Sequence, residues 1–369
     1  MKTVVVSAVS LRKGGTLAIL RSCLEYLGSR TSEYHIVALV HRRDLCDYPG
    51  IEYIELPWCT KSWAHRLWAE YVTMHRISLD MARREGEPVW MWLSLHDTTP
   101  RVLALHQEVY CHTSFPFLKV KARDWVMDPK IPLFALFTKW AYRINVHRND
   151  SLIVQQEWFA DALSRLIGVD RAKFRVIPPR PVVSAVPEIP GGSAVPEGHF
   201  PYISALPAQH RRPEEVRNNI PEFLFASTAD CHKNFETLCE AARILESDGR
   251  NFKLVLTIDG CENRYSKWLL RRWGNVRSID FHGLMSKDEL LESYRRAGCF
   301  VFPSRVETWG LPISEYMEAN PDGKLILADL PYARETSQGR GTFFPVTDAV
   351  ALKNLMAEYI DSYEDTAIG

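Results

Sequence analysis

The chain lacks several features that would mark whole classes of protein. Its 369 residues contain no apolar run of the roughly 18 to 20 residues that a membrane-spanning helix needs. The first apolar run, residues 3–11, is too short for the core of a signal peptide followed by a cleavage site. Lysine and arginine number 45 and aspartate and glutamate also 45, so the net charge is zero. We therefore expect a soluble cytoplasmic protein that does not bind nucleic acid and that is free to touch the inner face of a membrane but not to cross it.

Motifs for the commonest cofactor and catalytic sites are missing as well. The sequence has no CxxC pair, no HExxH, no cluster of Cys and His, and no DxD in a loop after a strand, so we expect no metal site and no other cofactor. GxSxG is absent, which disfavours a serine hydrolase, and GxGxxG does not follow the first strand, which disfavours a nicotinamide dehydrogenase. The eight cysteines are scattered through apolar stretches and read as buried free thiols.

What is present is an alternation of buried-strand and helix patterns in two runs. Such alternation predicts parallel sheets built from βαβ units. Between the runs, residues 178–221 hold ten prolines and three glycines with little periodicity. Residues 1–180 carry a net charge of +7 and the remainder −7. We expect a doubly wound α/β domain at 1–178, a linker or irregular insertion at 179–221, and a second doubly wound domain at 222–347. A C-terminal helix is expected at 348–369, and a crossing back to the first domain is one arrangement open to it.

The most informative stretch is FVFPSRVETWGLPISE, residues 300–315. A buried strand is followed by a loop with Glu307, and Gly310 precedes a helix that has Pro312 in its first turn and Glu315 one turn further on. The free N–H groups and the positive dipole end of such a helix suit a phosphate, and flanking carboxylates suit sugar hydroxyls. Two glutamates eight residues apart are common by chance, so the argument depends on the whole arrangement.

This stretch resembles the nucleotide-sugar motif of the retaining glycosyltransferases of family four, which have the two-domain GT-B fold. The resemblance extends to the segment with Lys233 and to several strand ends and helices elsewhere, at residues 231–245, 282–304, 11–16, 109–117 and 151–163. It implies the fold class α/β, GT-B, with two Rossmann-like domains facing each other across a cleft.

The resemblance also implies roles for individual residues. Glu307 would contact the donor sugar, His112 would lie near the reacting centre, and Lys233 would bind the diphosphate. Glu315 would hold the ribose of the nucleotide. Further donor-binding positions are Gly310, Leu311, Thr228, Gly14, Gly15 and Leu284, and Asp97 is an acceptor-side candidate.

The residues alone leave alternatives open. Lys233 could be a solvated lysine, although a cation at a helix start is disfavoured. Gly14 and Gly15 could form a plain turn, and a satisfied strand-end role for His112 is equally compatible with the sequence. Many relatives carry an arginine where this chain has Ser227 or Thr228, so a second phosphate-binding cation must come from elsewhere; the candidates are Arg12, Lys13, Arg305 and Arg334.

The function that the resemblance implies is transfer of a hexose or deoxyhexose from a nucleotide sugar, with retention and without a metal. The acceptor would be a lipid-linked glycan of a surface polysaccharide such as O-antigen, lipopolysaccharide or capsule. Aromatic and basic residues mix in segments 61–84 and 117–143, which predicts weak association with an anionic membrane through the second segment. The alternatives are an epimerase or phosphorylase-like enzyme of the same fold, and a catalytically silent relative that acts as a binding subunit.

Overall fold

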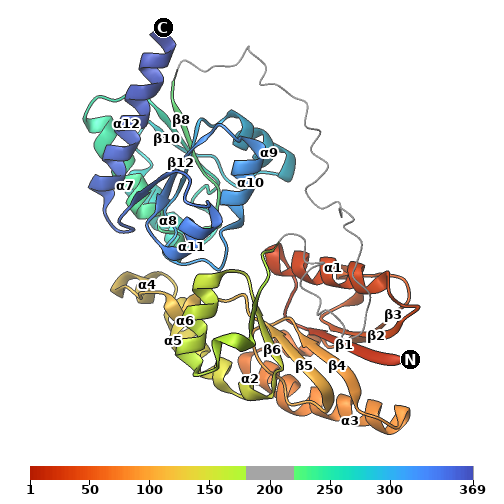
Figure 1. The fold of residues 1–369 in the computed structure, drawn as a ribbon. Coiled ribbons are helices and arrows are strands. Elements are labelled where there is room, and N and C mark those ends of the chain that lie inside the picture. Colours follow the sequence, from red (N-terminus) through yellow and green to blue (C-terminus); the bar gives the residue numbers. More distant parts are fainter. Residues whose placement is uncertain (180–219, 369) are drawn as a thin grey trace. The chain divides into compact units, whose positions relative to one another are not determined.

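The computed structural model describes residues 1–179 and 220–368. The predicted linker or insertion at 179–221 therefore lies outside the described residues except at its ends. The described residues form two compact units, each with its own parallel sheet (Figure 1). The first unit comprises residues 1–113 and 137–179, and the second comprises 114–136 and 220–368. The predicted two-domain, doubly wound architecture is confirmed.

The sheet of the first unit has the strand order β3-β2-β1-β4-β5-β6-β7, and every neighbouring pair in it is parallel. Chain order reverses between β1 and β4, and this is the place where open α/β sheets bind ligands. Its strands are β1 (Lys2–Ala8), β2 (Tyr34–Val40), β3 (Ile51–Glu55), β4 (Val89–Ser94), β5 (Ala104–Tyr110), β6 (Ser151–Val154) and β7 (Phe174–Val176).

Helices cover both faces of this sheet, which explains why its strands are apolar throughout rather than alternating. Val4 and Val6 of β1 point into one core with Leu20 of the first helix, whereas Val5 points into the other core with Met81. Figure 1 shows α1 and α3 on opposite sides of the sheet. The helices are α1 (Gly14–Gly28), α2 (Trp63–Trp68), α3 (Met74–Glu85), α5 (Lys130–Arg143) and α6 (Glu157–Ile167).

The sheet of the second unit has the order β10-β9-β8-β11-β12-β13 and is also parallel throughout. Here the chain order reverses between β8 and β11. The strands are β8 (Glu222–Phe225), β9 (Lys253–Leu256), β10 (Ile279–Phe281), β11 (Cys299–Phe302), β12 (Lys324–Ala328) and β13 (Thr342–Phe344). The helices are α7 (Phe235–Ser247), α8 (Arg264–Trp273), α9 (Lys287–Arg296), α10 (Leu311–Ala319), α11 (Pro331–Thr336) and α12 (Ala349–Ile368).

Two features of the second unit were not evident from the sequence. The C-terminal helix α12 packs against α7 and the strands β12 and β13 of its own unit. Residues 114–136, which the sequence analysis placed within a domain at 1–178, pack with the second unit and bring α4 (Ala122–Met127) to it. The next helix, α5, begins in the second unit and ends in the first.

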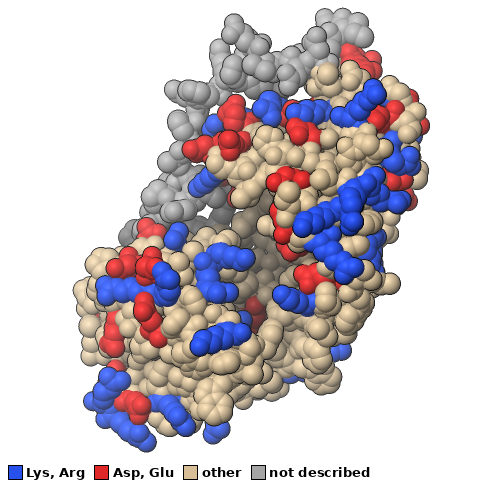
Figure 2. Space-filling view, turned by 180° about the vertical axis from the view of Figure 1, so that it is seen from behind, with Lys and Arg blue, Asp and Glu red and all other residues tan. Residues whose placement is uncertain are grey.

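Other expectations from composition concern thiols and membrane spans. All eight cysteines are free, and seven are buried as predicted, while Cys261 is exposed. Among the helices of the described residues, none has both the length and the apolar character that a membrane span requires. The charged side chains are spread unevenly over the face drawn in Figure 2, with Lys and Arg gathered on part of the second unit.

Candidate functional site

The central strands of the second unit bring two predicted site residues together. Lys233 follows β8 and Glu307 follows β11, and these strands are neighbours at the point where the chain order reverses. The carboxyl ends of both strands lie at the same edge of the sheet, so the loops that follow them meet there. The two residues are more than seventy positions apart in the sequence, and they lie close together because β8 and β11 are neighbours in the sheet.

Lys233 and Glu307 form an ion pair. The Nζ atom of Lys233 lies 2.6 Å from Oε1 of Glu307, and the hydroxyl of Ser304 donates a hydrogen bond of 2.6 Å to the same oxygen. Each of the two charged side chains is 15% exposed. The pair is therefore held by the fold and partly screened from water, with a small part of each side chain still exposed.

The turn that carries Lys233 is fixed to the neighbouring strand by Asn234. This fully buried residue has a left-handed φ of 62°, and its Nδ2 donates to the carbonyl oxygens of Pro303 at 3.0 Å and Val346 at 2.7 Å. Asparagine tolerates this backbone conformation better than most residues. A short 3₁₀ turn, η8 (Cys231–Lys233), precedes it, and the helix α7 begins directly after it at Phe235. Lys233 thus stands beside the end of β11.

The helix start after Gly310 also has the predicted form. Gly310 has a φ of +84°, and a Cβ atom there would lie 3.2 Å from a methyl group of Ile313, so glycine is strongly favoured. Pro312 lies in the first turn of α10, where the backbone N–H has no partner within the helix. Leu311 is the first residue of this helix. Pro312 has no N–H, and the N–H of Ile313 donates to the carbonyl oxygen of Gly310 at 2.9 Å, so the first turn offers the N–H of Leu311 and the positive end of the helix dipole near the end of β11.

Glu315 lies on α10 beside a buried tyrosine. The hydroxyl of Tyr294 donates to Oε2 of Glu315 at 3.2 Å. Burial, reinforced by this carboxylate, holds the pKa of Tyr294 well above its ordinary value, so the tyrosine remains a proton donor. This hydrogen bond from Tyr294 helps to orient the Glu315 carboxylate. This contact was not predicted from the sequence.

Two further predicted donor-binding residues lie at the surface of the second unit. Thr228 is exposed, and its hydroxyl donates to Oδ2 of Asp230 at 2.7 Å, which stabilises the loop after β8. Leu284 is 91% exposed in the loop between β10 and α9. A leucine so exposed is available for contact with a flat apolar group.

The structure shows how two of the four candidate cations are used. Arg305 is buried and forms a bidentate ion pair with Asp124 of α4, at 2.6 and 3.0 Å, and donates to the carbonyl oxygen of Cys231. It therefore fastens residues 114–136 to the second unit. Arg334 is half exposed and pairs with Asp329 at 2.6 Å. Arg12 and Lys13 are exposed in the first unit.

In the first unit, Gly14 and Gly15 lie at the exposed start of α1, directly after β1. The helix α1 begins at Gly14, so both glycines belong to its first turn. Gly14 has a φ of +61°, which favours glycine, and a Cβ atom there would meet no neighbour within 4 Å. The backbone is thus open to close approach at this strand end.

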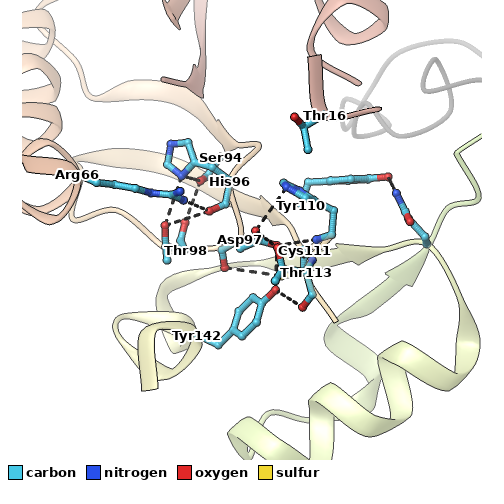
Figure 3. Close-up of polar contacts among 12 residues, drawn as sticks. Thr16, Arg66, Ser94, His96, Asp97, Thr98, Tyr110, Cys111, Thr113 and Tyr142 are labelled. Atoms are coloured by element: carbon cyan, nitrogen blue, oxygen red, sulfur yellow. Dashed lines mark hydrogen bonds and ion pairs between the residues drawn. The ribbon is translucent and has the colours of Figure 1, made fainter. Parts of the chain in front are cut away.

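Asp97 is the centre of a hydrogen-bond cluster after β4 (Figure 3). Its Oδ1 accepts from the backbone N–H groups of His112 at 2.6 Å and Thr113 at 3.0 Å, and from the Tyr142 hydroxyl at 2.8 Å. Its Oδ2 accepts from the Thr113 hydroxyl at 2.6 Å and lies 3.5 Å from Nε2 of His112. The structure thus brings the two predicted residues Asp97 and His112 into contact, and the chain itself engages both carboxylate oxygens.

The charge state of this cluster follows from its contacts. Burial by itself would raise the pKa of Asp97, but the His112 ring and the hydrogen bonds from Thr113, His112 and Tyr142 outweigh it and hold the pKa below its ordinary value. Burial, followed by the charge of Asp97, raises the pKa of the Cys111 thiol and also that of the Tyr142 hydroxyl. A carboxylate, a neutral thiol and a neutral phenol therefore share this strand end.

A second network, on the other side of Asp97, was missed by the sequence analysis. Glu70 is fully buried in a π-helical turn, η3 (Ala69–Thr73), and lies 2.8 Å from Nε of Arg66 and 3.3 Å from Nδ1 of His96. Burial lowers the pKa of His96 to about 4, so its ring is neutral at pH 7. This network fixes the backbone just before Asp97, whose φ is 68°. A single π-helical turn is a feature often found at functional sites.

No group of His, Cys, Asp and Glu within residues 1–179 and 220–368 has the geometry to hold a metal ion.

Sequence comparison identifies one family. Residues 208–366 match the family described as glycosyl transferases group 1. This region contains Lys233, Glu307 and Glu315 and covers the second unit except for residues 114–136 and the last residues of the chain. No curated protein matches the chain in sequence.

Several solved structures share the fold over nearly the full length. A glycosyltransferase from Rickettsia africae is 14% identical, with a TM-score of 0.62, and the match covers 98% of this chain and 88% of that one. WaaG, a glycosyltransferase involved in lipopolysaccharide biosynthesis, is 13% identical with a TM-score of 0.61, covering 98% and 92%. HepE of Anabaena, solved with UDP-glucose, is 13% identical with a TM-score of 0.59, covering 99% and 91%. The chain therefore has the GT-B fold, and within it residues 208–366 match the glycosyl transferases group 1 family.

Proposed function

We propose that the chain is a retaining, metal-independent glycosyltransferase that moves a hexose or deoxyhexose from a nucleotide sugar to a glycan acceptor. The observation that carries the proposal is the pairing of Lys233 with Glu307 beside the start of α10, within the group 1 domain. One cation, one carboxylate and a helix N-terminus converge at the ends of two central strands. These are the groups that a sugar diphosphate requires.

Each residue has a distinct role in this proposal. Lys233 and the first turn of α10, from Gly310 and Leu311, neutralise the diphosphate as the bond to the sugar breaks. Glu307 accepts hydrogen bonds from the sugar hydroxyls, and Glu315 holds the ribose. The exposed Leu284 packs against the base, and Thr228 supports the loop after β8.

In the first unit, His112 lies at the sugar and Asp97 positions it. Because both oxygens of Asp97 are engaged with the 112–113 segment and Tyr142, we assign this carboxylate the positioning of His112 and not direct contact with the acceptor. At the start of α1, Gly14 and Gly15 have no side chains, which in this proposal lets the donor approach the backbone closely. Arg305 is buried against Asp124, so Arg12, Lys13 and Arg334 remain the candidates for the second phosphate-binding cation.

The transfer itself is a front-face displacement. The bond from the anomeric carbon to the phosphate oxygen breaks with its electron pair on the phosphate, and the acceptor oxygen bonds to the same face of that carbon. The acceptor proton passes to the leaving phosphate oxygen. An oxocarbenium-like transition state results, and the positive groups at the diphosphate stabilise the charge that develops there. No protein nucleophile takes part.

The proposed acceptor is a lipid-linked glycan in the assembly of a bacterial surface polysaccharide, at the cytoplasmic face of the membrane. WaaG, which shares the fold, acts in lipopolysaccharide biosynthesis, and this likeness supports the pathway without identifying the acceptor. The second candidate is a silent binding subunit, favoured by the absence of an arginine at Ser227 and Thr228. Slow hydrolysis of the donor in the absence of acceptor distinguishes an enzyme from such a subunit.

A thermal-shift screen of UDP-, GDP- and dTDP-sugars tests the donor. A ligand present at a hundred times its Kd stabilises the native state by about 2.7 kcal/mol, so the true donor should stand out. Lys233→Ala should abolish most of that shift. Lys267→Ala, at an exposed lysine on α8 of the same unit, is the matched control and should keep it. No shift with any donor, or an unchanged shift in Lys233→Ala, would refute the proposal.

A further inference from the structure

The helix α5 exposes an apolar face. Leu133, Leu136, Phe137, Trp140 and the following Ile144 are 44%, 46%, 64%, 57% and 43% exposed. Their spacing of three and four residues places them on one side of the helix, within an arc of about 100°. All of them belong to one continuous helix and its next residue, so the helix alone fixes their common face. We call these five residues the α5 face.

The α5 face is not needed for the core of the protein. The opposite side of α5 is already buried, through Ile131, Ala135, Thr138 and Tyr142. A helix at the surface of a soluble protein ordinarily presents polar residues to water. A contiguous apolar surface of this kind marks a site of interaction with a partner or with a lipid surface.

Basic residues border the α5 face. Lys130 is exposed at the start of the helix, and Arg143 is exposed at its end. Nζ of Lys139 and the guanidinium carbon of Arg143 lie 5.6 and 5.4 Å from the centre of the Trp140 ring. Residues 130–144 contain no aspartate or glutamate. An apolar stripe with tryptophan at its centre and cations at its edges suits the boundary between acyl chains and anionic headgroups.

The same charges disfavour a second copy of the chain as the occupant. A two-fold symmetric contact would place Lys130, Lys139 and Arg143 of both copies against the same surface, with no carboxylate within residues 130–144 to pair with them. An anionic bilayer supplies the opposite charge and accepts the apolar side chains at once. Charge complementarity therefore selects the lipid surface.

We propose that the α5 face docks the protein on an anionic membrane, with Phe137 and Trp140 inserted at the headgroup boundary. The inference deepens the proposed function, since a lipid-linked acceptor lies in such a surface. It also assigns membrane binding to different basic residues from those that the sequence favoured. Lys121 and Arg123, in the segment that the sequence favoured, lie 3.8 and 3.3 Å from Glu236, and Arg123 covers the ring of Trp268. The cations that serve the membrane are those of α5.

Co-sedimentation with vesicles of phosphatidylglycerol and phosphatidylcholine tests the proposal on the full chain. The double variant Phe137→Ser/Trp140→Ser should bind about tenfold more weakly or worse, since it removes two large apolar side chains. Lys130→Ser/Lys139→Ser should weaken binding at low salt by about fivefold for each charge, and high salt should remove that difference. Trp68→Ser on α2 is the matched control, because Trp68 is 57% exposed, as Trp140 is, and it should bind like the wild type.

Four outcomes would overturn the inference. The first two are that the wild type binds vesicles of phosphatidylcholine alone as well as the anionic vesicles, and that Phe137→Ser/Trp140→Ser binds the anionic vesicles as well as the wild type does. The third is that Trp68→Ser loses as much vesicle binding as this double variant. The fourth is that the wild type binds no vesicles and forms a dimer that the double variant does not form. Thermal shifts with UDP-, GDP- and dTDP-sugars, measured on the same variants, separate this inference from the proposed function. Vesicle binding without any nucleotide shift would leave the docking face in place and remove the transferase.

Discussion

Replacing Glu307 by glutamine tests the central ion pair most directly. In the ligand-free protein, Glu307 neutralises Lys233 at 2.6 Å, and the hydroxyl of Ser304 binds the same oxygen. Glutamine has almost the same shape and keeps an acceptor for both donors. Glu307→Gln therefore removes one negative charge with little change in packing, and the loop after β11 should keep its conformation.

The magnitude follows from where a phosphate must lie. A phosphate oxygen that binds the same ammonium group is about 4.5 Å from the carboxylate, which at an effective dielectric constant of about 20 gives a repulsion of about 3 to 4 kcal/mol per unit charge. Solvent screening reduces this, since both side chains are 15% exposed. We expect a net gain of about 1 kcal/mol, so UDP should bind Glu307→Gln about fivefold more tightly than the wild type.

Turnover should respond in the opposite direction. The neutral amide accepts hydrogen bonds from the sugar hydroxyls less strongly, and the loss is largest where positive charge develops in the transition state. We expect kcat to fall by about a hundredfold or more. Titration calorimetry with UDP and initial-rate measurements with the donor identified by thermal shift provide the two readouts. Lys233→Ala should weaken UDP binding, and Glu315→Ala should do so through the ribose.

The result that refutes this reasoning is a loss of UDP affinity in Glu307→Gln as large as that in Lys233→Ala. It would mean that the carboxylate holds the lysine in place for the nucleotide and does not compete with it. Equal UDP affinity in the wild type and all three variants would remove the assignment of the site altogether.

Three further predictions concern the fold, the acid range and the chemistry. Arg305→Leu leaves Asp124 without its cationic partner in a buried position, so the free energy of unfolding of the second unit, measured in urea, should fall by about 3 to 5 kcal/mol. The double variant Arg305→Leu/Asp124→Leu should recover most of this loss, and an equal loss in both variants would contradict the prediction. The fold holds the pKa of Asp97 below its ordinary value of 3.8, so the ionised carboxylate stabilises the folded state above that pH, and this stabilisation is lost as pH falls through the lower folded-state pKa. Below about pH 4, the melting temperature of the wild type should therefore fall more steeply with pH than that of Asp97→Asn. Activity should persist in excess EDTA and proton NMR should show the donor's anomeric configuration in the first product, while an inverted product, or activity that returns only with manganese, would exclude the mechanism.

The sequence predicted the strands well because each is a short apolar run in a doubly wound sheet. The run at residues 3–9 is buried on both faces, so its identity as β1 required no knowledge of distant contacts. The start of α10 was equally accessible, since Gly310 and Pro312 express local backbone requirements. The proximity of Lys233 and Glu307 was implied by the family resemblance, and the order of β8 and β11 in the sheet gives its physical cause.

The contacts that local patterns could not reveal are those between residues far apart in the chain. Arg305 and Asp124 are separated by 181 positions, and nothing in the spacing around either residue indicates a partner. The same holds for Tyr142 and Asp97, which lie 45 positions apart. Composition did indicate an unusual surface at 117–143, but it could not distinguish the cations engaged with Glu236 from those that border Trp140.

The attachment of residues 114–136 to the second unit bears on the recombination of such enzymes. An exchange of C-terminal halves between two glycosyltransferases, made to alter the donor, would naturally be cut in the proline-rich stretch at 178–221. Such a chimaera would inherit Arg305 without its own Asp124, and a buried guanidinium would face a foreign helix. An exchange that transplants residues 114–136 together with the C-terminal half would preserve this pair. The segments that must be exchanged together are thus separated in the gene, although they pack together in one unit of the fold.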